Sequence, residues 1–235
     1  MNKYFLKIVI AGILSIGSLG FAQTTANLQR NITRVAQTQQ AEVKITLDWF
    51  REVEMREFMV RPARGGIHKS KIVLDKKTKQ TQCKGVLTQA GQVVMPAVCA
   101  KQGNWQLSQF TLTFANGKKG IGNSKAFRME GEVVYIEVVS ELTKGLVGLP
   151  LAVTPKGKSL EEHYGKGILD TIASFFRSKG VACSERYYRP GKVHYGDSTL
   201  QVGDAILYKG KLVALVKDSV KHVHTVSEKP LAILR

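Results

Sequence analysis

Ser198 is the serine of this sequence whose neighbours would suit a catalytic nucleophile. Ser198 follows Gly196 and Asp197, although the same combination is common in ordinary turns. A serine hydroxyl is a weak nucleophile until a neighbouring base removes its proton, and no histidine stands beside this motif. We interpret Ser198 as a turn residue. We keep as an alternative a serine hydrolase or peptidase that uses Ser198 with an atypical base.

Metal binding and ring stacking have weaker support. His222 and His224 would share one face of a strand, but no third ligand has a matching spacing, so we expect no metal site and no cofactor. The segment 186–189, Arg-Tyr-Tyr-Arg, carries rings of the kind that stack on bases or sugars. Its mixed composition favours an ordinary exposed loop, and we find no dedicated nucleic-acid motif.

Two of the three cysteines have a spacing that suits a disulfide. Cys83 and Cys99 lie at the outer ends of two short apolar segments, 85–87 and 93–95, which a polar turn joins. An antiparallel pair of strands brings its outer ends together, so the two sulfurs can meet. Closing this loop would contribute about 3 kcal/mol. Cys183 is then left over, and we expect a small buried thiol or an intermolecular disulfide there.

The elements that must position these residues are mostly short strands. Residues 43–49 alternate apolar and polar side chains, which is typical of a half-buried strand, whereas 50–59 give no clear pattern. Lys209-Gly210 joins two apolar runs with almost no loop, as in a β-hairpin. Further strands are predicted at 72–74, 85–87, 93–95, 109–114, 132–139 and 212–216.

One segment departs from this pattern. In residues 167–178 the side chains of Ile168, Ile172 and Phe175 with Phe176 fall on one helical face, and Lys179-Gly180 provides a helix end. Many short strands with one brief helix predict an all-β fold, either a barrel or a sandwich.

The N-terminus predicts export. Residues 1–22 combine an early positive charge, an apolar run at 8–19 and small residues at 20 and 22, as in a cleavable signal peptide. No later apolar run is long enough to span a bilayer. We therefore expect a bacterial-type secreted or periplasmic protein, in which the polar residues after the signal peptide begin an N-terminal leader.

The charge balance favours an acidic partner. The formal net charge is +17, and it is +15 once Lys3 and Lys7 leave with the signal peptide. Such an excess attracts anionic polymers, lipid headgroups or acidic proteins. The lysines are scattered, however, so a solvated basic surface without a dedicated ligand is an equally good interpretation.

The segment between the two cysteines resembles the trypsin-like (chymotrypsin-type) serine proteases. That family has Cys-x-Gly-x-Leu, a turn, and Val-Leu-Thr-Ala-Ala-His-Cys at the same cysteine spacing. The matching residues here are Cys83, Gly85, Leu87, Val93, Ala97 and Cys99. Weaker matches follow in order: 167–178 resembles the intermediate helix, 181–183 a strand of the specificity pocket, 196–198 the nucleophile loop, and 206–215 the hairpin after it.

The resemblance implies a fold and a division of the chain. It predicts two packed Greek-key β-barrels with one short intermediate helix, and a Cys83–Cys99 disulfide. The chain would then consist of a signal peptide (1–22), an N-terminal extension (23–66) and a double-barrel domain (67–235).

The resemblance also locates the positions of the catalytic triad. Val98 stands at the histidine position, and Tyr135 or, in another register, Glu137 stands at the aspartate position. The nucleophile position is Ser198 when counted from the third cysteine, and Val202 when counted back from the hairpin turn. A valine cannot accept a proton, so the triad is broken on either count.

From this we expect a pseudoprotease rather than an enzyme, acting as a binding or structural module. Its partner would be a protein or an anionic component of the cell envelope. A basic module that binds anionic polymers of the envelope is a further alternative, beside the serine hydrolase.

Overall fold

The computed structural model describes residues 36–58, 70–183, 192–195, 199–217, 224–225 and 231–235. Contacts divide the chain into two parts, Met1–Gln39 and Gln40–Arg235. The described residues of the first part, 36–39, are helical. Everything that follows concerns the second part. Among the described residues no helix has the length and hydrophobicity to span a membrane.

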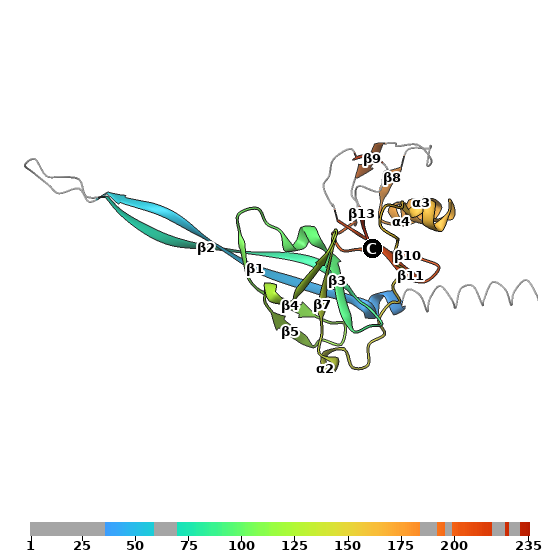
Figure 1. The fold of residues 1–235 in the computed structure, drawn as a ribbon, viewed down its shortest axis with the longest axis horizontal. Helices are drawn as coiled ribbons and strands as arrows, with labels where there is room; N and C mark the ends of the chain where they lie inside the picture. Colours follow the sequence, from blue (N-terminus) through green and yellow to red (C-terminus); the bar gives the residue numbers. More distant parts are fainter. Residues whose placement is uncertain (1–35, 59–69, 184–191, 196–198, 218–223, 226–230) are drawn as a thin grey trace, which may run out of the picture. The chain divides into compact units, whose positions relative to one another are not determined.

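A seven-stranded antiparallel sheet, in the order β5-β4-β1-β2-β3-β7-β6, is the largest element (Figure 1). Its strands are β1 (Glu42–Phe58), β2 (Ser70–Leu87), β3 (Gln92–Pro96), β4 (Gln106–Thr113), β5 (Lys119–Gly122), β6 (Phe127–Glu130) and β7 (Val133–Glu137). Two short 3-10 helices, η1 (Ala97–Ala100) and η2 (Ser124–Ala126), connect them.

β1 and β2 form a hairpin that is longer than the sheet. They pair from Glu42 with Val86 to Phe58 with Ser70. β4 pairs with β1 only over 44–50, so the rest of the hairpin is a two-stranded ribbon (Figure 1). β1 falls in the range 23–66 that the sequence assigned to an N-terminal extension, and in the structure it is an inner strand of the sheet.

The sheet is amphipathic, and it curls. Val43, Ile45 and Leu47 are buried on its inner face, since successive side chains of a strand point to opposite faces. The rings of Phe110 on β4 and Phe127 on β6 stack 5.0 Å apart, although these strands lie near opposite ends of the strand order. The sheet therefore closes on itself as a half-barrel around one apolar core.

The C-terminal half forms two small sheets and a second core. The sheets have the orders β10-β11-β13 and β12-β9-β8. Their strands are β8 (Val181–Cys183), β9 (Lys192–Tyr195), β10 (Ala205–Tyr208), β11 (Lys211–Val216), β12 (His224–Thr225) and β13 (Leu231–Ile233). The helices are α2 (Ser140–Thr143), α3 (Leu160–Tyr164) and α4 (Gly167–Ser178). Side chains of α3, α4, β10, β11 and β13 bury this second core together.

The main fold predictions are confirmed. The described residues are mostly β, with few short helices, and α4 occupies the range predicted for the intermediate helix. It buries Ile168, Ile172 and Phe176, and Gly180 follows it with a φ of +77°. The Lys209-Gly210 turn joins β10 to β11 with both residues at positive φ, as the sequence indicated.

Candidate functional site

The predicted disulfide is present. Cys83 on β2 is bonded to Cys99 in η1, with their Cα atoms 6.2 Å apart. The bond ties η1 to the inner face of the sheet, and both cysteines are buried. Cys183, the third cysteine, lies in β8.

The disulfide places Val98 beside Val202. Both valines line a hollow of about 120 Å³, whose other lining residues are Leu47, Thr81, Gln82, Cys83, Cys99 and Gln102. Val98 is 47% exposed, so its side chain is accessible to a ligand in this hollow. The structure thus brings together the histidine position and one of the two nucleophile positions that the resemblance assigned.

The loop that carries Val202 is held tightly against β2. The backbone N–H of Lys84 donates to the carbonyl of Val202 at 3.2 Å, and the N–H of Gly203 donates to Val216 at 2.7 Å. Gly203 has a φ of +92°, and a Cβ at this position would lie 1.9 Å from the carbonyl oxygen of Lys84. Only glycine fits here, because a side chain would meet both a forbidden conformation and the backbone of β2.

A buried carboxylate adds an ionic contact. Asp204 is 5% exposed, and it lies 3.1 Å from the ammonium of Lys84 and 3.4 Å from that of Lys179. Glu42 adds a pair with Lys84 at 3.3 Å. Burial by itself lowers the pKa of Lys84, but the hydrogen bond and charge of Asp204, together with Glu42, outweigh it and raise the pKa above its ordinary value of 10.5. Lys84 therefore stays charged.

A larger hollow adjoins the same loop. It measures about 570 Å³, and it shares Gln82, Cys83 and Val202 with the smaller one. Its remaining lining residues are Lys44, Ile45, Thr46, Lys84, Thr113, Leu200 and Gln201. The two hollows therefore meet at β2 and Val202.

The edge of β2 between these hollows is open. β2 pairs with β1 along its whole length, but β3 covers its other side only at Val86 and Leu87. The N–H of Lys84 points away from β1 to reach Val202, so by the two-residue alternation the backbone groups of Gln82 and Gln80 point the same way. No described strand pairs with them.

The third triad position lies elsewhere. Tyr135 is buried on β7, with the guanidinium of Arg128 4.9 Å from its ring centre. Burial, and then the charge of Glu130, raise the pKa of Tyr135 above its ordinary value of 10.0. Glu137, the other register, is exposed at the end of β7 and accepts a hydrogen bond from Gln92. Neither lines the hollow of Val98 and Val202.

Several predicted residues lie outside the described part of the chain. These are Ser198 with Gly196 and Asp197, the segment 186–189, His222 and the signal peptide. His224 lies in β12. The described residues hold no group of three or more His, Cys, Asp or Glu side chains that could bind a metal ion.

Sequence reasoning missed a group of side chains next to the smaller hollow. The guanidinium of Arg51 lies 4.8 Å from the ring centre of Trp105, and the ammonium of Lys79 lies 4.6 Å from it. Lys79 also donates to the side-chain oxygen of Gln102 at 2.9 Å. The Nε atom of Arg51 is buried, and it has no hydrogen-bond partner among the described residues. The sequence feature that could have indicated this group is Trp105, a tryptophan in a polar segment. Its partners could not be predicted, because the sequence did not show that β1 and β2 form a long hairpin.

Comparison with known proteins gives structural similarity only. No family model and no curated protein match the sequence. Among solved structures, a serine-to-alanine variant of the HtrA-type protease AlgW with a decapeptide is similar at 10% identity and a TM-score of 0.39, over 84% of this chain and 63% of that one. AlgW itself with a decapeptide is similar at 10% identity and a TM-score of 0.34, over 85% and 60%. The chain spans less than two thirds of either protein.

One expectation from the sequence is corrected by these findings. We expected that the chain is not an enzyme, but the solved structures that it matches are HtrA-type, hence trypsin-like, proteases. The described residues do not show that a catalytic triad is lost, because Ser198 lies outside them. The expected pseudoprotease status therefore has no structural support. The solved structures that the chain resembles do have the trypsin-like type of fold that the sequence suggested.

Proposed function

We propose that this chain binds an extended peptide segment of a partner protein along the open edge of β2. The observation that carries the proposal is the meeting of two hollows at this edge, beside backbone groups that no described strand uses. An added strand would continue the hydrogen bonding that Lys84 begins with Val202. Export, as expected from the N-terminus, would place this partner in the periplasm or outside the cell.

The hollows suit the geometry of such a strand. Side chains of a strand alternate between its two faces, so successive residues of the peptide would point into opposite hollows. The smaller hollow has Leu47, Val98 and Val202 in its lining and suits one aliphatic side chain. The larger one is lined by Lys44, Gln82 and other polar side chains, and suits a polar or charged side chain.

The test uses a substitution that fills the smaller hollow. Val98→Trp should weaken binding of an unfolded model protein, reduced and carboxymethylated α-lactalbumin, by about ten-fold or more in Kd, because the loss of one buried anchor costs 1–3 kcal/mol. Val147→Trp is the matched control, since Val98 and Val147 are each 47% exposed. Fluorescence anisotropy measures both. Equal binding by the Val98→Trp variant and the wild type would refute the proposal.

A further inference from the structure

A group of cations lies on the β1–β2 ribbon next to the proposed peptide site. We call Arg51, Lys77, Lys79 and Trp105 the Trp105 cluster. Arg51 and Lys77 are directly opposite each other in the register of β1 and β2, and Lys79 is two residues from Lys77, on the same face of the ribbon. The cations of Arg51 and Lys79 both lie within 5 Å of the centre of the Trp105 ring, at 4.8 and 4.6 Å.

No described carboxylate neutralises the charges of this cluster. Among the described residues none of its three cations forms an ion pair. Two acidic residues, Asp75 and Glu57, fall on the same face of the ribbon by the register of β1 and β2. Asp75, two residues from Lys77, forms no ion pair with a described residue. Like charges directly opposite each other destabilise a pair of strands. No described group accepts a hydrogen bond from the buried Nε atom of Arg51. An anionic group placed beside the cluster would relieve the repulsion between its cations.

The cluster is continuous with the smaller hollow. Gln102 lines that hollow together with Val98 and Val202, and it also accepts a hydrogen bond from Lys79. Side chains on one face of a strand are two residues, or about 7 Å, apart. A peptide that seats an apolar side chain in the hollow therefore presents side chains two and four residues further along toward Lys79 and Arg51.

We propose that the Trp105 cluster makes the site selective for acidic segments. The partner carries an apolar side chain in the smaller hollow, and an aspartate or glutamate two to four residues away contacts Arg51 and Lys79. Arginine suits this role because its planar group donates two parallel hydrogen bonds to a carboxylate, and the Trp105 ring holds it in place. This inference rests on the proposed peptide binding, and it adds the chemistry of the partner.

The experiment compares two labelled decapeptides with the same single apolar residue. One peptide has glutamate at the positions two and four residues after the apolar residue, and the other has glutamine at both. The glutamate peptide should bind about ten-fold more tightly at low ionic strength, and its advantage should shrink at high ionic strength because salt screens exposed charges. Arg51→Gln and Lys79→Gln should each remove most of this preference, while the glutamine peptide binds as before.

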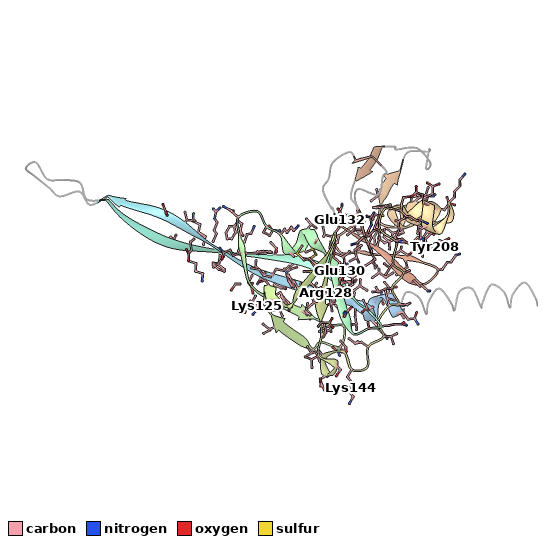
Figure 2. The ribbon with its side chains drawn as sticks, in the orientation of Figure 1. Lys125, Arg128, Glu130, Glu132, Lys144 and Tyr208 are labelled. Atoms are coloured by element: carbon pink, nitrogen blue, oxygen red, sulfur yellow. A yellow bond between two sulfur atoms is a disulfide. The ribbon has the colours of Figure 1, made fainter. Side chains whose placement is uncertain are left out.

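Matched controls exist elsewhere on the chain. Arg128 lies 4.9 Å from the ring centre of Tyr135, and Lys209 lies 5.2 Å from that of Tyr208, so each repeats the local geometry of a cluster cation. Figure 2 shows Arg128 and its partner Glu130, which lie 3.0 Å apart. Arg128→Gln and Lys209→Gln remove the same charge and should keep the preference for glutamate.

The possible results separate the two proposals. If both peptides bind equally to the wild type and Val98→Trp abolishes both, acidic selectivity is wrong and peptide binding stands. A preference that survives in both cluster variants also refutes the role of the cluster. A third result would overturn both proposals. In it, binding of the glutamate peptide depends on Arg51 and Lys79, its Kd is unchanged by Val98→Trp, and polyphosphate binds more tightly than the peptide. The site would then bind an anionic polymer.

Discussion

At the scale of single residues, Asp48 shows how the outer face of the sheet is held together. Its two carboxylate oxygens accept hydrogen bonds from Gln80 at 2.8 Å and Gln109 at 3.0 Å, so one side chain on β1 bridges both neighbouring strands. These two bonds favour the ionised form and lower the pKa of Asp48 below its ordinary value of 3.8, against a small opposing effect of burial.

This gives a prediction for the dependence of stability on pH. Because the pKa of Asp48 is lower in the folded state than in the unfolded state, its stabilising effect is present above about pH 4 and is lost as the pH falls through the folded-state value. Asp48→Asn should lower the free energy of unfolding by up to about 1 kcal/mol at pH 7, and by less at pH 3. Urea unfolding at both pH values measures this.

Asp75→Asn is the control for this measurement, since Asp75 lies on the same hairpin and accepts no described hydrogen bond. Its effect should stay small at both pH values. A difference between wild type and Asp48→Asn that grows toward acid pH would contradict the assignment.

The residues of the site were predictable only in part. The Cys83–Cys99 disulfide followed from spacing and from the resemblance, and it is present. To predict that Val98 and Val202 line one hollow, one of two registers had to be chosen for the nucleophile position, and the local sequence did not decide between them. The burial of Asp204 beside Lys84 and Lys179 could not be predicted, because the residues next to Asp204 in the sequence do not indicate partners on β2 and after α4.

At the scale of elements, the tight contact between β2 and the loop at Val202 depends on one glycine. Gly203→Ala should lower the free energy of unfolding by about 2–4 kcal/mol, since the new Cβ would meet the backbone of Lys84 at 1.9 Å as well as a positive φ. Gly91→Ala is the matched control: Gly91 also has a positive φ, of +75°, but no described atom beyond its two chain neighbours lies within 4 Å of its Cβ position. It should cost about 1 kcal/mol. Chemical denaturation followed by circular dichroism measures both.

This prediction has a clear opposite outcome. If the two alanine variants lose the same amount of stability, the cost comes from the backbone conformation alone. The close contact of the loop with β2 would then contribute nothing, and the floor of both hollows would be less fixed than the structure indicates.

The strands show why some elements can be predicted and others not. Residues 43–49 alternate apolar and polar side chains because one face of β1 covers the core there. Beyond Phe50 the strand leaves the sheet and enters the ribbon, where no core selects apolar residues on one face. The alternation is therefore interrupted at Arg51 and ends at Glu57, although the strand continues to Phe58, and residues 50–59 show no clear pattern in the sequence. Helix α4 was predictable because it buries one face along its whole length.

At the scale of the whole molecule, the described part has two apolar cores, and Asp204 links them. One core lies inside the curled sheet, and the other is formed by α3, α4 and the small C-terminal sheet. Asp204 pairs with Lys84 on β2 and with Lys179 directly after α4, so a single buried carboxylate contacts elements of both. It also accepts a hydrogen bond from the backbone N–H of Gln201 at 2.9 Å.

The last prediction follows from this link. Asp204→Ala should lower the free energy of unfolding by about 3 kcal/mol, because it removes the buried counter-charge of Lys179 and leaves the ammonium of Lys84 with Glu42 alone. Asp204→Asn should cost less, since an amide oxygen still accepts from Gln201. Glu130→Ala is the control, because it breaks an exposed pair with Arg128, with side chains 41% and 57% exposed, and should cost at most about 1 kcal/mol. Guanidinium unfolding of the three variants measures the difference. If Asp204→Ala costs no more than Glu130→Ala, the two cores are held together by apolar packing alone, and the buried carboxylate serves only to position its own loop.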